Sequence, residues 1–371
     1  MRQQRHDRQD RATPLVRALS TLALSALLLV LGACAEYKKL SRGGSIAEVL
    51  VYDVFGQDRP PSEYYTYVRD SHRDSDFCYE CGSDSYVVDK SIDAVQRLGD
   101  AAYGRLEGEA EVVMLFTEVL LEDPSSMARA SAANSLTKIG LKLPRYDYAP
   151  VEDDGSRLLA MMQELDRLHV NTGRGVPVSR ATRDRTVQLM TSIGNLKFPG
   201  YLNTRNAIKI FYDREYLKDA ADPAVRSAID TALVKRMRAL ILDAMRFAVD
   251  DRDATVRIDA IRGLKTLGDR QGTEVVLQRL AVEPQWLVKI EAIEHVGKMG
   301  SRDGVVALAG LLNDPNASVR HKARGALTRI AGADYGARPE GWMHWARSVD
   351  PEIDFGALEP AADDEETDGD S

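Results

Sequence analysis

Apolar residues recur with a helical period in five stretches of the chain, which begin at Arg129, Arg183, Arg257, Lys289 and Arg320. In each stretch, small or apolar residues stand three, seven and ten positions after the basic residue, which places them on one side of an α-helix. Glycine or alanine follows directly, and glycine often ends helices because it adopts a left-handed conformation at little cost. The pattern therefore predicts one helix per stretch, buried along one face. The four columns are Ala132, Thr186, Ala260, Ala292 and Ala323; Leu136, Met190, Leu264, Val296 and Leu327; Ile139, Ile193, Leu267, Met299 and Ile330; and Gly140, Gly194, Gly268, Gly300 and Ala331.

The spacing of the stretches indicates pairs of helices. The last three begin 32 and 31 residues apart, which fits two helices and two turns. An acidic residue stands six positions before the basic one in four stretches, and proline follows the acid in three of them. Acid then proline is typical of an N-cap with proline at the first helical position. These acids are Asp123, Asp251, Glu283 and Asp314, and the prolines are Pro124, Pro284 and Pro315.

The order Asp-Pro, Val-Arg, Ala, Leu and Ile-Gly resembles the HEAT repeat, in the bacterial form related to phycobilin-lyase repeats. The resemblance is tight over residues 245–332 and looser before them. It implies an all-α fold, an α-solenoid of HEAT-like helix pairs with the armadillo-type superhelix, after an irregular N-terminal segment. It also implies a ladder of acidic and basic residues between neighbouring units. The Arg183 stretch lacks the acid, and Asp222-Pro223 opens a long first helix of the following unit.

The same resemblance predicts a binding groove. In HEAT geometry the second helix of each pair lines the concave face, so polar residues two, five and nine positions after the basic residue face a groove. Lys138, Lys298 and Arg329 form a basic column there, suited to an acidic segment of a partner protein. A solvated helix face carries similar charges, and that alternative remains open. The predicted groove residues are Lys138, Arg262, Glu291, Glu294, Lys298, Lys322 and Arg329.

The first 33 residues have the layout of a signal peptide, with five arginines before an uncharged run from Ala18 to Ala33. The run is shorter than a membrane-spanning helix requires. Leu31-Gly32-Ala33-Cys34 resembles the lipobox of bacterial lipoproteins, which implies lipidation of Cys34 as the first mature residue. We therefore expect a lipid-anchored protein of the bacterial cell envelope, facing the periplasm. Ala35, where aspartate favours the inner membrane, points to the outer membrane.

Cys78 and Cys81 form a CxxC pair among polar residues that read as a loop. In an oxidising compartment, a local disulfide is the simplest interpretation. A metal site is the alternative, because His72, Asp74 and Asp76 lie just upstream, although a second CxxC or a spaced histidine pair is absent. We leave disulfide and metal binding both open.

The whole chain is divided into four parts by composition. Residues 1–33 are the signal peptide, 34–87 an irregular segment with tyrosines and cysteines, 88–355 the repeats, and 356–371 a tail. Trp342 and Trp345 follow the last repeat and are expected to cap the exposed end of the solenoid. The tail carries seven acidic residues without apolar period, which is typical of disorder.

Composition and motifs favour a binding protein over an enzyme. The chain of 371 residues has 49 Lys and Arg against 57 Asp and Glu, and this acidic balance disfavours nucleic acid as a partner. The motifs GxxxxGK[ST], HExxH and GxSxG do not occur in the sequence. We expect no catalytic residues and no cofactor, and a scaffold for protein-protein interaction. The alternative is a metal- or redox-linked envelope protein that uses Cys78 and Cys81; a tetrapyrrole lyase follows only from the resemblance.

Overall fold

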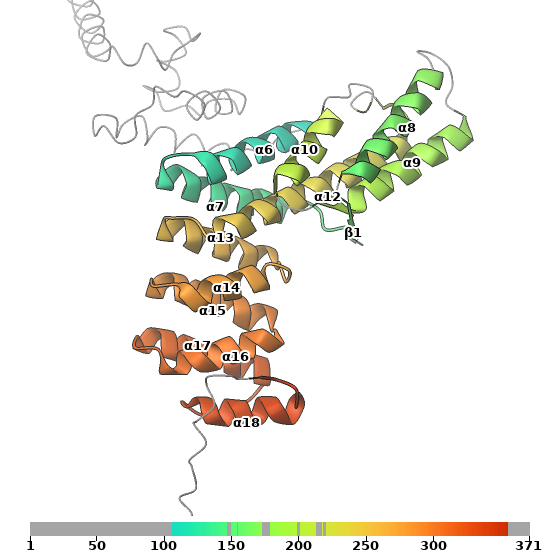
Figure 1. The fold of residues 1–371 in the computed structure, drawn as a ribbon. Helices are drawn as coiled ribbons and strands as arrows, with labels where there is room; N and C mark the ends of the chain where they lie inside the picture. Colours follow the sequence, from blue (N-terminus) through green and yellow to red (C-terminus); the bar gives the residue numbers. More distant parts are fainter. Residues whose placement is uncertain are drawn as a thin grey trace, which may run out of the picture. The chain divides into compact units, whose positions relative to one another are not determined.

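The computed structural model describes residues 106–146, 150–153, 155–172, 179–198, 201–212, 217 and 220–354. The chain divides into two units, Met1–Glu63 and Tyr64–Ser371, and every described residue belongs to the second. The described part is almost entirely helical (Figure 1). Its elements are α6 (Leu106–Glu122), α7 (Ser126–Lys142), β1 (Val151–Glu152), α8 (Ser156–Thr172), α9 (Arg180–Asn195), β2 (Leu196–Lys197), α10 (Tyr201–Tyr212), α12 (Pro223–Ala248), α13 (Ala254–Leu267), α14 (Thr273–Val282), α15 (Trp286–Met299), α16 (Arg302–Gly310), η2 (Leu311–Asn313), α17 (Ala317–Ala331) and α18 (Pro339–Val349).

The helices form an α-solenoid of stacked pairs, as the sequence predicts. The pairs are α6 with α7, α12 with α13, α14 with α15, and α16 with α17. The second helices form a continuous layer, because α13 packs between α7 and α15, and α15 also packs against α17. In the other layer, α6 contacts α12 and α14 contacts α16. Figure 1 shows the pairs from α13 to α17 stacked in chain order, with α18 at the end.

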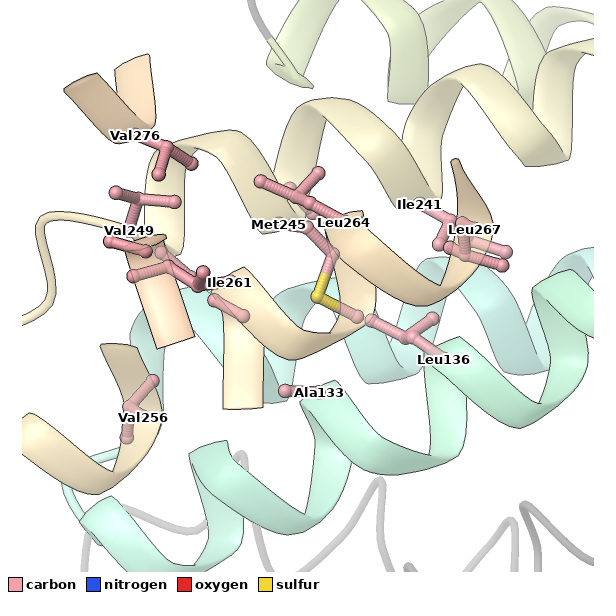
Figure 2. Close-up of a cluster of buried hydrophobic side chains, with 14 of the residues drawn as sticks. Ala133, Leu136, Ile241, Met245, Val249, Val256, Ile261, Leu264, Leu267 and Val276 are labelled. Atoms are coloured by element: carbon pink, nitrogen blue, oxygen red, sulfur yellow. The ribbon is translucent and has the colours of Figure 1, made fainter. Parts of the chain in front are cut away.

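The predicted apolar stripes form the interface between neighbouring pairs. Ala132, Leu136, Ala260 and Leu264 have no exposed surface. Figure 2 shows Met245 of α12 extending between Leu136 of α7 and Leu264 of α13, so three helices share one cluster. The alanines keep the second helices close together, because a longer side chain at that column would separate them. The repeat pattern in the sequence therefore records helix packing.

The glycines that follow the stripes have two different roles. Gly268 and Gly300 stop α13 and α15 with φ values of 76° and 63°, as predicted. The prediction of a stop was wrong for Gly140 and Gly194, which lie inside the last turns of α7 and α9. Gly140 is buried, and a Cβ there would lie 2.9 Å from the side chain of Leu267. That position therefore needs a small residue for close packing rather than for a left-handed turn.

The Arg183 stretch is a helix, α9, but it is not a unit of the main stack. Its predicted stripe residues Met190 and Ile193 are buried in a separate apolar cluster with residues of α8 and α10. The helix packs against α12, while α7 packs directly on α13. Residues 143–222 are therefore inserted between two neighbouring HEAT-like pairs. Thr186, the non-apolar member of its column, was the sign of this difference.

Helix α12 joins the insertion to the stack. It spans 26 residues, which confirms the predicted long first helix, and Asp222 caps it with Pro223 in the first turn. Along its length it contacts α9, α10, α6 and α13. A short parallel pair, β1 with β2, places Val151 beside Leu196 within the insertion. The all-α fold predicted from the sequence did not include this pairing.

The predicted charge ladder is present along the edge where the first and second helices of each pair meet. Each basic residue donates to the acidic residue of the next pair in the stack, with N···O distances of 2.6–2.9 Å. The arginines also donate to the two backbone carbonyls of their own preceding turn. We call this set the turn-edge ladder; it consists of Arg129 with Asp251, Arg257 with Glu283, Lys289 with Asp314, and the terminal Arg320.

The ladder acids do not cap helices, contrary to the sequence-based expectation. The N-caps of α7, α13 and α17 are Ser125, Asp253 and Asn316, each two residues after the acid. Asp251 instead accepts the backbone N–H of Asp253 at 2.8 Å, and the other ladder acids accept in the same way. Asp251, Glu283 and Asp314 therefore each fix their own turn through one oxygen while the carboxylate also binds the preceding pair. This double role accounts for the acidic residue at that position.

Candidate functional site: the charged face of the second helices

The second helices carry a charged face at the columns that the sequence predicted for a groove. In spatial order α7, α13, α15 and α17, the first column reads Ser131, Asp259, Glu291 and Lys322; the second Asn134, Arg262, Glu294 and Gly325; the third Lys138, Thr266, Lys298 and Arg329. We call this surface the groove face. Thr266 of α13 lies between Lys138 and Lys298 in the third column, so the three basic residues do not form an unbroken row.

An alternating chain of ion pairs crosses the groove face. Arg262 of α13 donates to Asp259 at 2.9 Å and to Glu291 of α15 at 2.7 Å. Lys265 donates to both Glu291 and Glu294, at 2.8 and 2.7 Å. Lys322 of α17 then donates to Glu294 at 2.6 Å. Three acids and three bases thus link three successive pairs.

The ion pairs alter the protonation equilibria of their members. Hydrogen bonds from Lys265 and then Lys322 lower the pKa of Glu294 to about 2. Burial works against the charged form of Lys265, but its bonds to Glu291 and Glu294 outweigh burial and raise its pKa. Both shifts favour the charged forms of Glu294 and Lys265.

Sequence reasoning missed Lys265, which stands eight positions after Arg257, outside the three columns. The side chain is 18% exposed and bridges two carboxylates of the next helix. The sequence indicated Lys265 only indirectly, through Glu291 and Glu294, which stand one helical turn apart. Among the predicted groove residues, the helix opposite them supplied only one cation, Arg262. A second cation was needed opposite them.

The cations at the C-terminal end of the groove face have no carboxylate partner among the described residues. Lys298 donates to the backbone carbonyl of Lys265 at 2.7 Å, and Arg329 lies with Nη1 3.2 Å from the position of a Cβ on Gly297. His321 and Arg329 are both exposed, and each stands about one turn from Gly325 on α17, on opposite sides of it. The ion-pair chain is therefore charge-balanced, while this end is left cationic.

A shallow pocket of about 210 Å³ lies between α15 and α17 at this cationic end. Its apolar part consists of Ile293 and Ala326, which are 0% and 2% exposed. Gly325 leaves it open, since nothing lies within 4 Å of a Cβ placed there. The charged lining is Glu294, His321, Lys322 and Arg329. The arrangement suits a ligand that combines a carboxylate with a small apolar group.

The remaining predicted site residues lie outside the described residues. These are Cys34, the lipidation site, and Cys78, Cys81 and His72, the disulfide or metal candidates. Within the part of the chain that the structure describes, no group of three or more His, Cys, Asp or Glu side chains is arranged to hold a metal ion. No helix in those residues is both long and apolar enough to cross a bilayer.

Comparison with known proteins supports the repeat assignment. Residues 242–328 match the family model for HEAT repeats, and this span covers α13 to α17. A search of the curated proteins found no match. A solved structure of an engineered protein shares 16% sequence identity, with 79% of this chain and 80% of that chain covered and a TM-score of 0.23. The matched segment contains the turn-edge ladder from Arg257 onward and most of the groove face, so this part of the chain consists of HEAT-like repeats.

Proposed function

We propose that the protein is a non-enzymatic scaffold of the bacterial cell envelope, anchored by lipid on Cys34, whose groove face binds an acidic segment of another protein. HEAT repeats commonly bind proteins on the surface formed by successive helices. The observation that carries the proposal is the cationic end of the groove face, where His321 and Arg329 line an open pocket and Lys298 lies on the neighbouring helix α15. An acidic segment would supply the missing carboxylates.

The distribution of charge supports an interaction that depends on position. The protein as a whole has a formal net charge of -8, so an acidic partner is repelled by most of its surface. Attraction is confined to the cationic end, and such complementarity contributes mainly to specificity and to the rate of association. The proposal therefore predicts binding that weakens as salt rises.

The partner experiment uses the lipidated protein in its own envelope. Crosslinking and affinity purification are performed with the unaltered chain and with a triple variant, Lys138→Glu, Lys298→Glu and Arg329→Glu. The matched control is Arg270→Glu, an exposed arginine in the turn between α13 and α14, away from the groove face. We expect a stoichiometric partner that the triple variant loses and the control retains, with equal helical content by circular dichroism. Retention of every partner by the triple variant would show that the groove face is not the binding site.

The anchor is tested separately. Cys34→Ala should move the protein from the membrane fraction to the soluble fraction and abolish incorporation of labelled palmitate. The expectation rests on the lipobox. Stable attachment requires two or more acyl chains, so a chain without lipid on residue 34 should leave the membrane. Labelling that persists in the Cys34→Ala protein would contradict it.

A further inference from the structure

The groove face has a surplus of positive charge only at its C-terminal end. The acids Asp259, Glu291 and Glu294 are all bound by Arg262, Lys265 and Lys322. Arg329 of α17 lines the pocket together with His321, and Lys298 lies on the groove face of the neighbouring helix α15. Similar charges gathered on one surface repel each other, so a bound anionic segment stabilises this arrangement.

The same chain supplies such a segment. Residues 356–371 contain seven acidic residues and no lysine or arginine. Leu358 and two alanines precede the densest acidic run, which begins at Asp363. The segment therefore combines carboxylates with small apolar groups, which is the combination that the pocket between α15 and α17 suits.

The attachment point of this segment is close to the pocket along the stack. Helix α18 packs against α16, the partner helix of α17, and Ile353 is buried with the apolar core that includes α17. From Asp354 the chain continues for 17 residues, which reach about 60 Å when extended. Helix α17, with 15 residues, is about 22 Å long, so the tail is long enough to reach any point on it.

We infer that the acidic C-terminal segment, residues 356–371, binds in cis to the cationic pocket of His321, Gly325 and Arg329 and competes there with other acidic ligands. A tether of this length gives an effective concentration in the millimolar range, so individually weak contacts suffice to keep the site occupied. The inference uses the same surface as the proposed function but does not depend on the identity of a partner.

The test is zero-length carbodiimide crosslinking of the purified full-length chain, mapped by mass spectrometry. Carbodiimide joins a carboxylate to a lysine amine only when the two are in contact. We expect intramolecular crosslinks from residues 359–370 to Lys298 and Lys322, with a yield that does not depend on protein concentration. The double variant His321→Glu and Arg329→Glu should lower this yield about fivefold, because the attraction to Arg329 becomes a repulsion and a second carboxylate is added at position 321. The control Arg270→Glu should leave it unchanged.

Three results would overturn the inference. The first is a tail that crosslinks equally to lysines over the whole surface or to none. The second is a crosslink yield that the double variant does not change. The third is crosslinking that joins isotopically distinct copies in a mixed sample, which would place the tail of one copy on another. Loss of an envelope partner in the triple variant described above, without any crosslink between tail and pocket, would refute the inference and leave the proposed function standing.

A tail with its seven acids replaced by asparagine or glutamine tests the competition. If the tail occupies the pocket, this full-length variant should capture the envelope partner at least about threefold better than the unaltered chain. Equal capture by the two proteins would show that the tail does not compete.

Discussion

Replacing Arg257 with methionine removes the most buried pair of the turn-edge ladder. The side chains of Arg257 and Glu283 are 6% and 0% exposed. The guanidinium donates to both carboxylate oxygens of Glu283, at 2.9 and 2.8 Å, and to the carbonyls of Asp251 and Arg252. Methionine keeps most of the aliphatic stem, so the substitution removes the charge and the donors with little loss of packing.

The expected cost follows from what remains around Glu283. Breaking a buried ion pair costs about 3–5 kcal/mol when the remaining charge is left without compensation. Glu283 keeps a bond from Arg279 at 2.7 Å and one from the backbone N–H of Gln285 at 2.9 Å. These bonds reduce the penalty, while the loss of the donor to the carbonyl of Asp251 adds about 1 kcal/mol. We therefore expect a loss of about 3 kcal/mol in the free energy of unfolding.

Urea unfolding followed by circular dichroism measures this loss. Hydrogen exchange of peptides from α13 and α14 accompanies it, because repeat arrays can unfold in parts. The matched control is Arg262→Met, which removes the surface pairs with Asp259 and Glu291 from a side chain that is 52% exposed. Such pairs contribute about 0–1 kcal/mol. If the two variants lose the same stability, burial does not determine the strength of these pairs and the reasoning fails.

Three further predictions concern packing, pH and the end of the stack. Gly297→Val should destabilise the chain by about 1–3 kcal/mol, because its Cβ would lie 2.7 Å from the Cβ of Ala326. Gly325→Ala should stabilise the chain by about 1 kcal/mol, because its Cβ meets no atom within 4 Å and alanine favours a helix over glycine. Thermal melts compare the two variants, and equal shifts of the melting temperature would contradict the packing argument. Burial of His295, opposed by Asp269 and assisted by Lys265 and Lys298, lowers its pKa from 6.5 to about 4, so the folded state favours the neutral ring. The stability that the neutral ring contributes is fully present above pH 6.5, and about 3 kcal/mol of it is lost as the pH falls toward 4. The urea midpoints at pH 7 and pH 4.5 should therefore differ more in the unaltered chain than in His295→Gln. Equal differences in the two proteins would show that His295 does not cause the loss of stability. Trp342→Ala should lower the free energy of unfolding by about 3–5 kcal/mol, because the ring is fully buried and its Nε1 donates to the Gly336 carbonyl at 2.9 Å. Hydrogen exchange should become faster in α16 to α18 before it does so in α13. Unchanged exchange in α16 to α18 would show that Trp342 does not cap the stack.

The sequence predicts those parts of the fold that depend on short-range pattern. Apolar positions three, seven and ten residues after Arg257 determine which side of α13 is buried, because the helical period is a local property. The ladder was predictable through the family resemblance, since its acid and base keep a fixed separation in each unit. The N-cap was not: proline after Glu283 suggested a cap at the acid, but the helix begins two residues later, where the turn that the acid fixes ends.

The charge pairing on the groove face depends on how successive helices are offset, which no local pattern gives. Counting columns identified Glu291 and Glu294, but their shared partner Lys265 lies between columns and donates to both carboxylates, at 2.8 and 2.7 Å. The surplus of cations at Arg329 likewise becomes visible only after the pairs before it are known. A list of charged residues therefore overestimates the free charge of such a surface.

The insertion shows why stack order cannot be read from chain order. Arg129 binds Asp251, 122 residues away, whereas the next two ladder contacts join residues 26 and 25 apart. The N···O distances are similar in all three contacts, at 2.8, 2.9 and 2.6 Å. Helices α7 and α13 are therefore direct neighbours in the stack, as α13 and α15 are. Solenoid stability comes from contacts between neighbouring units, and a chain that leaves after α7 and returns through α12 preserves all of them.

The way the chain returns also explains the length of α12. One helix must provide the first layer of the stack opposite α6 and, further toward its N-terminus, a surface for α9 and α10. A helix of ordinary length covers only one of these surfaces, because each residue adds about 1.5 Å. The 26 residues of α12 therefore connect two apolar clusters, with Leu233 in one and Ala232 in the other. The insertion is therefore joined to the stack by a continuous helix that packs against both of them.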